Sequence, residues 1–109
     1  MFNIFRKKYE TKDINTAGQE LAENPNILLL DVRTPAEYNA GHLPGSINLP
    51  LDAIEGIAQK YPDRDRRIFA YCQSGARSGA ACNILAKLAY TDVTNIGGIM
   101  AWQGKITTK

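Results

Sequence analysis

The sequence predicts an α/β domain with a mainly parallel central sheet of about five strands and helices on both faces. Residues 27–32 and 68–71 are apolar without alternation, which is the pattern of strands buried on both faces of a parallel sheet. The segments between and after these runs carry apolar residues at helical spacing. Strands that alternate with helices form parallel sheets, because each connecting helix must pack back onto the sheet.

The remaining elements follow from turn signals and periodicity. We expect a loosely ordered leader over residues 1–8, then an edge strand near 9–14, a helix ending near 23, the strand 27–32, a short helix over 35–41, a strand over 46–49, a helix over 51–61, the strand 68–71, a helix over 78–90, a strand over 93–96 and a brief helix or turn through 102. No linker or repeat interrupts this order, so residues 1–109 are interpreted as one domain.

Two helix starts carry capping signals. Asn15 or Thr16 can cap the first helix, because either side chain accepts from the unpaired N–H groups of a first turn. Thr34, Pro35 and Glu37 have the spacing of a capping box with proline at the first helical position.

Composition and charge argue against several classes of partner. The net charge of +2 is small and the basic residues are mostly spread out, so we expect no nucleic-acid partner. No stretch approaches the roughly 18 apolar residues of a spanning helix. Apolar residues precede the basic run 6–8, the reverse of a secretory signal. We therefore expect a cytoplasmic protein without a membrane partner, and a monomer.

The two cysteines, Cys72 and Cys82, do not indicate a disulfide or a metal site. Their number and spacing do not fit a zinc motif. If the segment after Cys72 is helical, the two residues are about 15 Å apart along the axis, whereas a disulfide needs Cα atoms within about 7 Å. Free thiols favour a reducing compartment. Cys82, inside a helix near its apolar face, is interpreted as an inert packing residue.

Cys72 directly follows a predicted buried strand and precedes a small-residue loop and a helix. It therefore lies at the carboxyl edge of the sheet, where α/β domains bind ligands. Only the thiolate attacks well, and three features favour it: the positive end of the next helix, loop amides that can form an anion-binding nest, and a nearby arginine. We predict Cys72 as the catalytic residue and the following loop as its substrate-binding cradle: Gln73, Ser74, Gly75, Ala76, Arg77 and Ser78.

Four ordered motifs resemble those of rhodanese-homology domains, the thiosulfate sulfurtransferase family, and the resemblance covers residues from about 14 to 102. They are the cysteine loop Cys72-Gln73-Ser74-Gly75-Ala76-Arg77-Ser78; Leu30-Asp31-Val32-Arg33 followed by Glu37-Tyr38; Gly41-His42-Leu43-Pro44-Gly45-Ser46-Ile47-Asn48-Leu49-Pro50; and Gly97-Gly98 with Trp102 four residues on. No single motif is specific, but the ordered set is.

The resemblance implies an enzyme, a thiosulfate sulfurtransferase. Cys72 attacks the sulfane sulfur of thiosulfate, carries it as a persulfide, and passes it to cyanide, a small thiol or a protein thiol. No metal or organic cofactor is implied. An alternative is a persulfide-relay module that receives sulfur from a partner protein and turns over little thiosulfate.

Loop length argues against a cysteine-based phosphatase or arsenate reductase. Those phosphatases place five residues between cysteine and arginine, whereas only residues 73–76 separate Cys72 from Arg77. A shorter loop makes a smaller cradle, which resembles the sulfurtransferase form.

Three further residues are interpreted as support for the site. The resemblance makes Asp31 and Arg33 a charged scaffold at the end of a buried strand, although they could also shape the wall of the site. His42 is expected to hydrogen-bond backbone in a turn, because attack by an ionised thiol needs no general base. With only seven residues after Trp102 and no second half, we also expect an open site.

Overall fold

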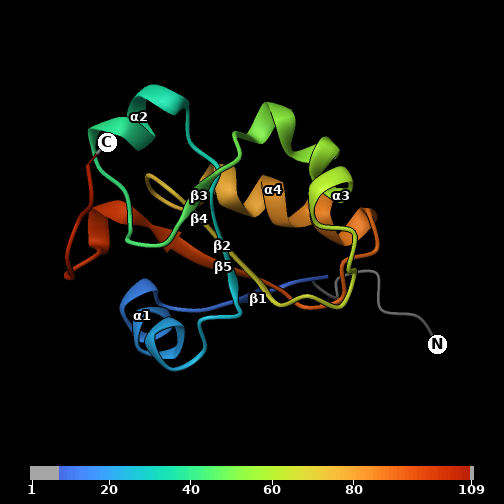
Figure 1. Ribbon diagram of the computed structural model, residues 1–109, viewed down its shortest axis with the longest axis horizontal. Helices are drawn as coiled ribbons and strands as arrows, with labels where there is room; N and C mark the ends of the chain where they lie inside the picture. Colours follow the sequence, from blue (N-terminus) through green and yellow to red (C-terminus); the bar gives the residue numbers. More distant parts are fainter. Residues whose placement is uncertain (1–7, 109) are drawn as a thin grey trace.

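The computed structural model describes residues 8–108 and contains a five-stranded, fully parallel sheet with the strand order β1-β5-β4-β2-β3 (Figure 1). This confirms the predicted fold class. The elements in chain order are β1 (Glu10–Thr11), α1 (Ile14–Glu23), β2 (Leu28–Asp31), α2 (Pro35–Ala40), β3 (Ile47–Asn48), the 3₁₀ helix η1 (Leu51–Gly56), α3 (Ile57–Lys60), β4 (Ile68–Cys72), α4 (Ala76–Lys87), β5 (Val93–Gly98) and the 3₁₀ helix η2 (Ile99–Ala101). The predicted leader lies, apart from residue 8, outside the described residues.

The register of the sheet brings three strand ends together at its carboxyl edge. Asp31 of β2 pairs with Tyr71 of β4, and Cys72 of β4 pairs with Gly98 of β5. Between Ala70 and Tyr71 the β4–β5 register shifts by one residue of β5, which is the geometry of a β-bulge. The residues that follow β2 and β4 therefore share one edge, as ligand sites of parallel sheets do.

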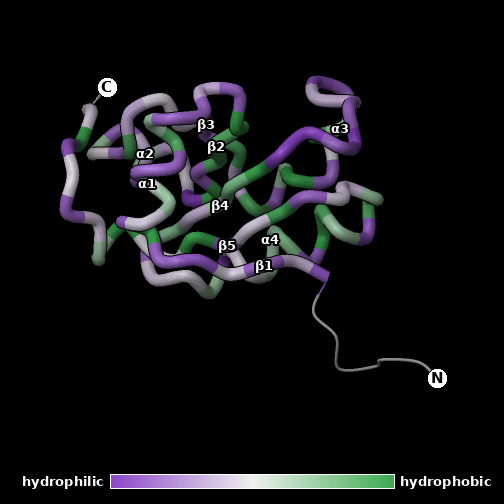
Figure 2. Tube along the Cα trace, turned by 90° about the horizontal axis from the view of Figure 1, so that it is seen from below, coloured by the Kyte–Doolittle hydropathy of each residue, from purple (hydrophilic) through white to green (hydrophobic). Residues whose placement is uncertain are grey.

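Helices cover both faces of the sheet, and each face buries its own apolar cluster. One cluster lies between the sheet and α4, η1 and α3; it includes Leu30, Ile54 and Leu85. The other lies under α1 and η2 and includes Ile14, Phe69 and Ile96. Figure 1 shows α1 on one side of the sheet and α4 with α3 on the other. In Figure 2 hydrophobic residues run along the central strands while hydrophilic colouring gathers on the outer loops.

The cap of α1 differs from the prediction. Asp13 is the N-cap, and its carboxylate accepts hydrogen bonds from the backbone N–H groups of Asn15 and Thr16. The helix thus begins at Ile14, before both predicted caps, because the Asp13 carboxylate satisfies two N–H groups of its first turn. The Asn15 side chain instead joins distant backbone: it donates to the Ala101 carbonyl and accepts from the Gln103 N–H.

The predicted helix over 51–61 is divided. Its first part is the 3₁₀ helix η1 and only Ile57–Lys60 is α-helical. Leu51, Ile54 and Ile57 are spaced three apart, and Ile54 and Ile57 are buried, so the apolar stripe has the three-residue period of a 3₁₀ helix. Gly56 lies at the junction.

The helix after the cysteine loop begins at Ala76, two residues earlier than predicted. Its start places Arg77 and Ser78 in the first turn and not in the loop. It ends at Lys87, and Ala89 has a positive φ of 75°, in the left-handed region where helices stop. Of the helices formed by residues 8–108, none is both long and apolar enough to cross a membrane.

Candidate active site

The cysteine loop wraps its backbone around the sulfur of Cys72. Gly75 has a left-handed φ of 105° and is the N-cap of α4. This conformation, which suits glycine because a side chain is strained at positive φ, turns the Gly75 N–H toward Sγ at 3.0 Å. Ser78, in the first turn of α4, brings its hydroxyl oxygen to 3.4 Å from the same sulfur.

These donors lower the pKa of the Cys72 thiol. Cys72 is 1% exposed, and burial alone raises the pKa of the thiol. Hydrogen bonds from Ser78, Gly75 and Ser74 favour the thiolate and outweigh that effect, so the pKa lies below its ordinary value. The predicted thiolate cradle is therefore formed by one strand end, one glycine turn and one helix start.

Residues of β5 and η2 pack against the backbone of the cysteine loop. Gly98 lies so close that a Cβ built on it would overlap the Gln73 carbonyl and lie 2.5 Å from the Ser74 Cα. The Met100 N–H donates to the Gln73 carbonyl at 3.2 Å. Of the Gly-Gly pair noted in the sequence, Gly98 therefore serves close approach of backbone to backbone, whereas Gly97 has a positive φ of 97°. Within β5, Asn95 also contacts the cradle, and sequence reasoning missed it because an asparagine in a strand carries no local signal.

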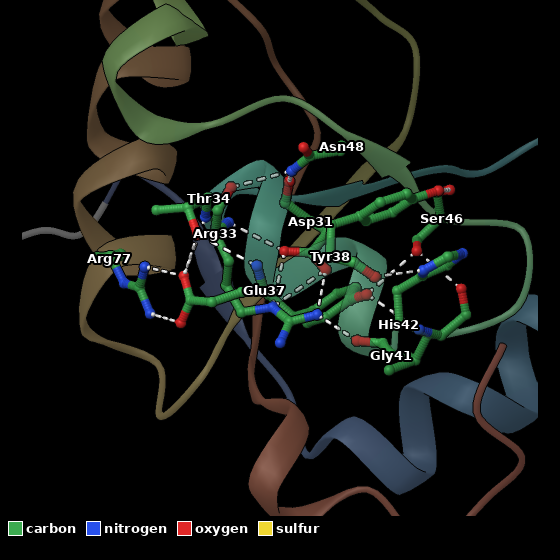
Figure 3. A network of polar contacts seen from close by, with 12 residues as sticks. Asp31, Arg33, Thr34, Glu37, Tyr38, Gly41, His42, Ser46, Asn48 and Arg77 are labelled. Atoms are coloured by element: carbon green, nitrogen blue, oxygen red, sulfur yellow. Dashed lines mark hydrogen bonds and ion pairs between the residues drawn. The ribbon is translucent and has the colours of Figure 1, made fainter. Parts of the chain in front are cut away.

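Arg77 forms a two-point ion pair with Glu37 of α2 (Figure 3). The Nη1–Oε1 and Nη2–Oε2 distances are 2.8 and 3.0 Å. Arg77 and the hydrogen bonds from Thr34 lower the pKa of Glu37 to about 2. The sequence predicts for Glu37 only a role at its helix start. It does complete the predicted capping box with Thr34, and it also binds the arginine of the cysteine loop.

Asp31, the last residue of β2, and Arg33 form a buried ion pair (Figure 3). The Arg33 Nη2 lies 2.6 Å from Asp31 Oδ2, and the side chains are 5% and 0% exposed. Burial disfavours the guanidinium charge, but the Asp31 carboxylate more than compensates, so the pKa of Arg33 is raised. The same Nη2 donates to the Gly41 carbonyl at 2.7 Å. These contacts favour the structural interpretation of both residues.

His42 hydrogen-bonds backbone, as expected for a turn residue. Its Nδ1 lies 2.7 Å from the Tyr38 carbonyl, and its ring stacks on the Tyr38 ring at a centroid distance of 3.7 Å. Its backbone N–H donates to the Thr107 carbonyl and its carbonyl accepts from the Thr107 N–H, so Thr107 pairs with this turn. These contacts hold the link between α2 and β3.

Tyr71 and Cys82 are both buried and lie outside the cradle. The Tyr71 side chain points to the face opposite Cys72, as neighbours in a strand do. Its hydroxyl accepts from the Leu43 N–H at 3.0 Å and lies 3.1 Å from Ser46 Oγ. Burial raises the pKa of Cys82 to about 12, which favours an inert thiol. Within residues 8–108 no three His, Cys, Asp or Glu side chains gather closely enough to hold a metal ion.

A parallel α/β domain with a strand-end cysteine in an amide cradle defines a class of cysteine-dependent group-transfer proteins. Residues 15–105 match the family model described as Rhodanese-like domain. The chain belongs to the rhodanese-like domain family.

Individual relatives agree with this membership. The chain is 42% identical over 91 residues to "Sulfurtransferase" of Allochromatium vinosum, with 83% of this chain and 84% of the relative covered. It is 42% identical over 71 residues to "Thiosulfate sulfurtransferase PspE" of Escherichia coli strain K12, with 64% and 68% covered. A solved structure described as "rhodanese with anions from E. coli" has a TM-score of 0.71 and 34% identity, and the match covers 76% of this chain and 99% of that one.

Proposed function

We propose that this protein is a sulfurtransferase in which Cys72 takes a sulfane sulfur from thiosulfate or another persulfide donor and passes it to cyanide or a thiol. The observation that carries the proposal is the Cys72 sulfur at the end of β4, which accepts the Gly75 N–H at 3.0 Å and has a lowered pKa. The names of the two relatives above support sulfur transfer as the activity and thiosulfate as one donor.

The reaction has two half-reactions. The Cys72 thiolate attacks the outer sulfur of thiosulfate, an S–S bond forms, and the sulfur–sulfur bond of thiosulfate breaks. Sulfite leaves with the electron pair, and Cys72 carries a persulfide. The acceptor nucleophile then attacks the outer sulfur of that persulfide, and the Cys72 thiolate is regenerated. Covalent catalysis of this kind has ping-pong kinetics.

The cradle is suited to the anions of both half-reactions. The backbone N–H groups of Ser74, Gly75 and Ser78 bond the Cys72 sulfur where α4 begins, and the helix dipole adds positive potential there. The name of the Escherichia coli neighbour, which records bound anions, supports an anion site in this fold. Because both cysteines are thiols, we also propose a reducing compartment, such as the cytoplasm, as the location.

The direct test is the mass of the protein after incubation with thiosulfate. Wild type should gain the mass of one sulfur atom, and cyanide should remove it. Cys72→Ser should gain nothing, whereas Cys82→Ala, the matched control for the second thiol, should behave as wild type. A folded wild-type protein that gains no sulfur from thiosulfate or from a persulfide donor contradicts the proposal.

A second candidate is a persulfide relay with little thiosulfate turnover, and the ion pair of Arg77 favours it. Glu37 neutralises much of the charge that Arg77 offers to a free anion. A relay would receive sulfur from a partner's persulfide, which carries less charge than thiosulfate. Turnover with thiosulfate should be compared with turnover with a small persulfide donor. A persulfide preference of a hundredfold or more in kcat/KM identifies the relay.

A further inference from the structure

Asn95 is a half-buried residue of β5 that contacts the cradle from the sheet. Its Nδ2 donates to the Gly75 carbonyl at 3.2 Å, and its Oδ1 accepts from the Gly97 N–H at 3.0 Å. Because a backbone carbonyl only accepts and a backbone N–H only donates, these two bonds fix which end of the amide is the oxygen. That oxygen lies 2.7 Å from the hydroxyl oxygen of Ser78, so in the hydrogen bond between the two side chains Ser78 is the donor.

The single hydroxyl proton of Ser78 has four acceptors within reach. They are Asn95 Oδ1 at 2.7 Å, the Gly75 carbonyl at 3.1 Å, Cys72 Sγ at 3.4 Å and the Gly97 carbonyl at 3.5 Å. A hydroxyl donates one hydrogen bond at a time, and 2.7 Å is the preferred distance for an O–H···O bond. When Ser78 donates to Asn95, its proton is therefore withheld from the sulfur.

We propose that Asn95 is a positioning residue for sulfur transfer. Its side-chain oxygen competes with the Cys72 sulfur for the hydrogen bond of the Ser78 hydroxyl and thereby sets the basicity of the thiolate. The inference rests on the proposed role of Cys72 as the sulfur carrier. A thiolate with fewer donors is more basic and attacks faster. When the Cys72 sulfur must act as a leaving group, rotation of the Ser78 hydroxyl directs its hydrogen bond to the sulfur. This rotation needs no movement of the backbone.

The charged and titratable groups around this network come from several elements. Arg77 and Cys82, both on α4, interact electrostatically with Cys72. Asp31, from β2, acts on Arg77. The Tyr9 hydroxyl and Asn95 Nδ2 both lie beside Gly79, 3.4 and 3.5 Å from the position of a Cβ. None of these groups is changed by a substitution at Asn95, so each variant below shares them.

The test is the pH profile of Cys72 alkylation by iodoacetamide, followed by intact mass in a Cys82→Ala background. In Asn95→Ala the hydroxyl of Ser78 turns to the sulfur. The midpoint of the alkylation profile, which is the pH of half-maximal rate, should fall by about 0.5–1 pH unit. The limiting rate at high pH should fall about twofold, because a less basic thiolate is a weaker nucleophile. A purely structural role predicts the opposite sign, since a distorted cradle loses donors and the midpoint rises. An unchanged or raised midpoint therefore overturns the inference.

A double-mutant cycle keeps the inference testable if Asn95→Ala fails to fold. Asn95→Asp keeps the acceptor oxygen and adds a charge, so the midpoint should rise by about one pH unit. In a Ser78→Ala background Asn95→Asp acts only through its charge, so the rise of the midpoint should be clearly smaller than in the presence of Ser78. An equal rise in both backgrounds contradicts competition for the proton.

The same samples separate this inference from the proposed function. Wild type that alkylates normally but takes up no sulfur contradicts the function and leaves the alkylation profiles intact. Wild type that takes up sulfur, with Asn95 variants whose midpoints do not move as stated, contradicts only the role of Asn95.

Discussion

The guanidinium of Arg77 and the carboxylate of Glu37 form a two-point ion pair that joins the start of α4 to α2, between residues 40 apart in sequence. The pair holds the Arg77 guanidinium beside the cradle, and the Glu37 carboxylate neutralises part of its charge. A guanidinium has five N–H donors and the carboxylate engages two of them, so Arg77 keeps donors for an anion. The same contact makes Arg77 both a structural and a binding residue, and variants can separate the two roles.

Arg77→Ala should lower kcat/KM for thiosulfate at least tenfold while the melting temperature falls by only a few degrees. The side chains of the pair are more than a third exposed, and such pairs contribute about 0–1 kcal/mol to stability. Glu37→Gln is the control, because it removes the ion pair and keeps the cation, so thiosulfate use should be retained. Steady-state sulfite release and thermal melts measure both effects. Equal activity losses in the two variants would show that only the pair, and not the cation, matters.

The Glu37 carboxylate should make stability depend on pH in the acid range. Its pKa of about 2 in the folded protein lies below its ordinary value of 4.5. A lowered carboxyl pKa stabilises the fold fully above about pH 4.5, and this contribution is lost as the pH falls toward 2. Glu37→Gln should therefore be less stable than wild type at pH 7, and the two should converge near pH 2. Urea unfolding at several pH values measures the free energy of unfolding of both proteins. A difference between them that does not shrink as the pH falls contradicts the prediction.

Gly98→Ala should disrupt the cradle. A Cβ at this position would meet backbone of Gln73 and Ser74, which cannot move aside as a flexible side chain does. We expect a loss of sulfur uptake of tenfold or more, together with a lower melting temperature. Gly56→Ala is the matched control, since its φ is −85° and nothing lies within 4 Å of the added methyl. A Gly98→Ala protein with wild-type uptake would show that the loop tolerates displacement.

The two thiols should differ sharply in native reactivity. Cys72 has a lowered pKa, whereas burial raises that of Cys82 to about 12. Brief treatment with iodoacetamide at pH 7 should add one label, on Cys72, and treatment in denaturant should add two. Peptide mass mapping identifies the labelled residue. Labelling of Cys82 in the folded protein at a comparable rate would contradict its interpretation as a packing residue.

Arg33→Met should destabilise the fold without removing any group of the cradle. It leaves the fully buried Asp31 carboxylate without its cation, which typically costs about 3–5 kcal/mol. Protein that remains folded should still take up sulfur on Cys72. Asp31→Asn with Arg33→Met removes both charges and should recover part of the loss. Urea unfolding and intact mass measure the two properties, and a double variant no more stable than Arg33→Met would count against an unpaired charge as the cause.

Much of the site could be predicted from the sequence because its signals are local. The strand before Cys72 is an unbroken apolar run, and the glycine turn and the helix after it follow within a few residues. The capping box of Thr34 and Glu37 is also confirmed, since its two reciprocal bonds span only three residues. The helix boundaries differ from the prediction: α4 begins at Ala76 and not at Ser78, because the left-handed Gly75 itself starts the helix.

The sequence by itself determined the order of strands and helices, the parallel sheet and the cysteine loop, because periodicity and turn chemistry act over a few residues. Only the tertiary structure decided which distant groups meet that loop. Glu37 reaches Arg77, Asn95 reaches Ser78, and Gly98 lies under Gln73 because strand pairing brings separate segments to one sheet edge. Side-chain pairs across such distances leave no periodic trace in the sequence. They depend on register, bulge and packing, which fix positions only once the chain is folded.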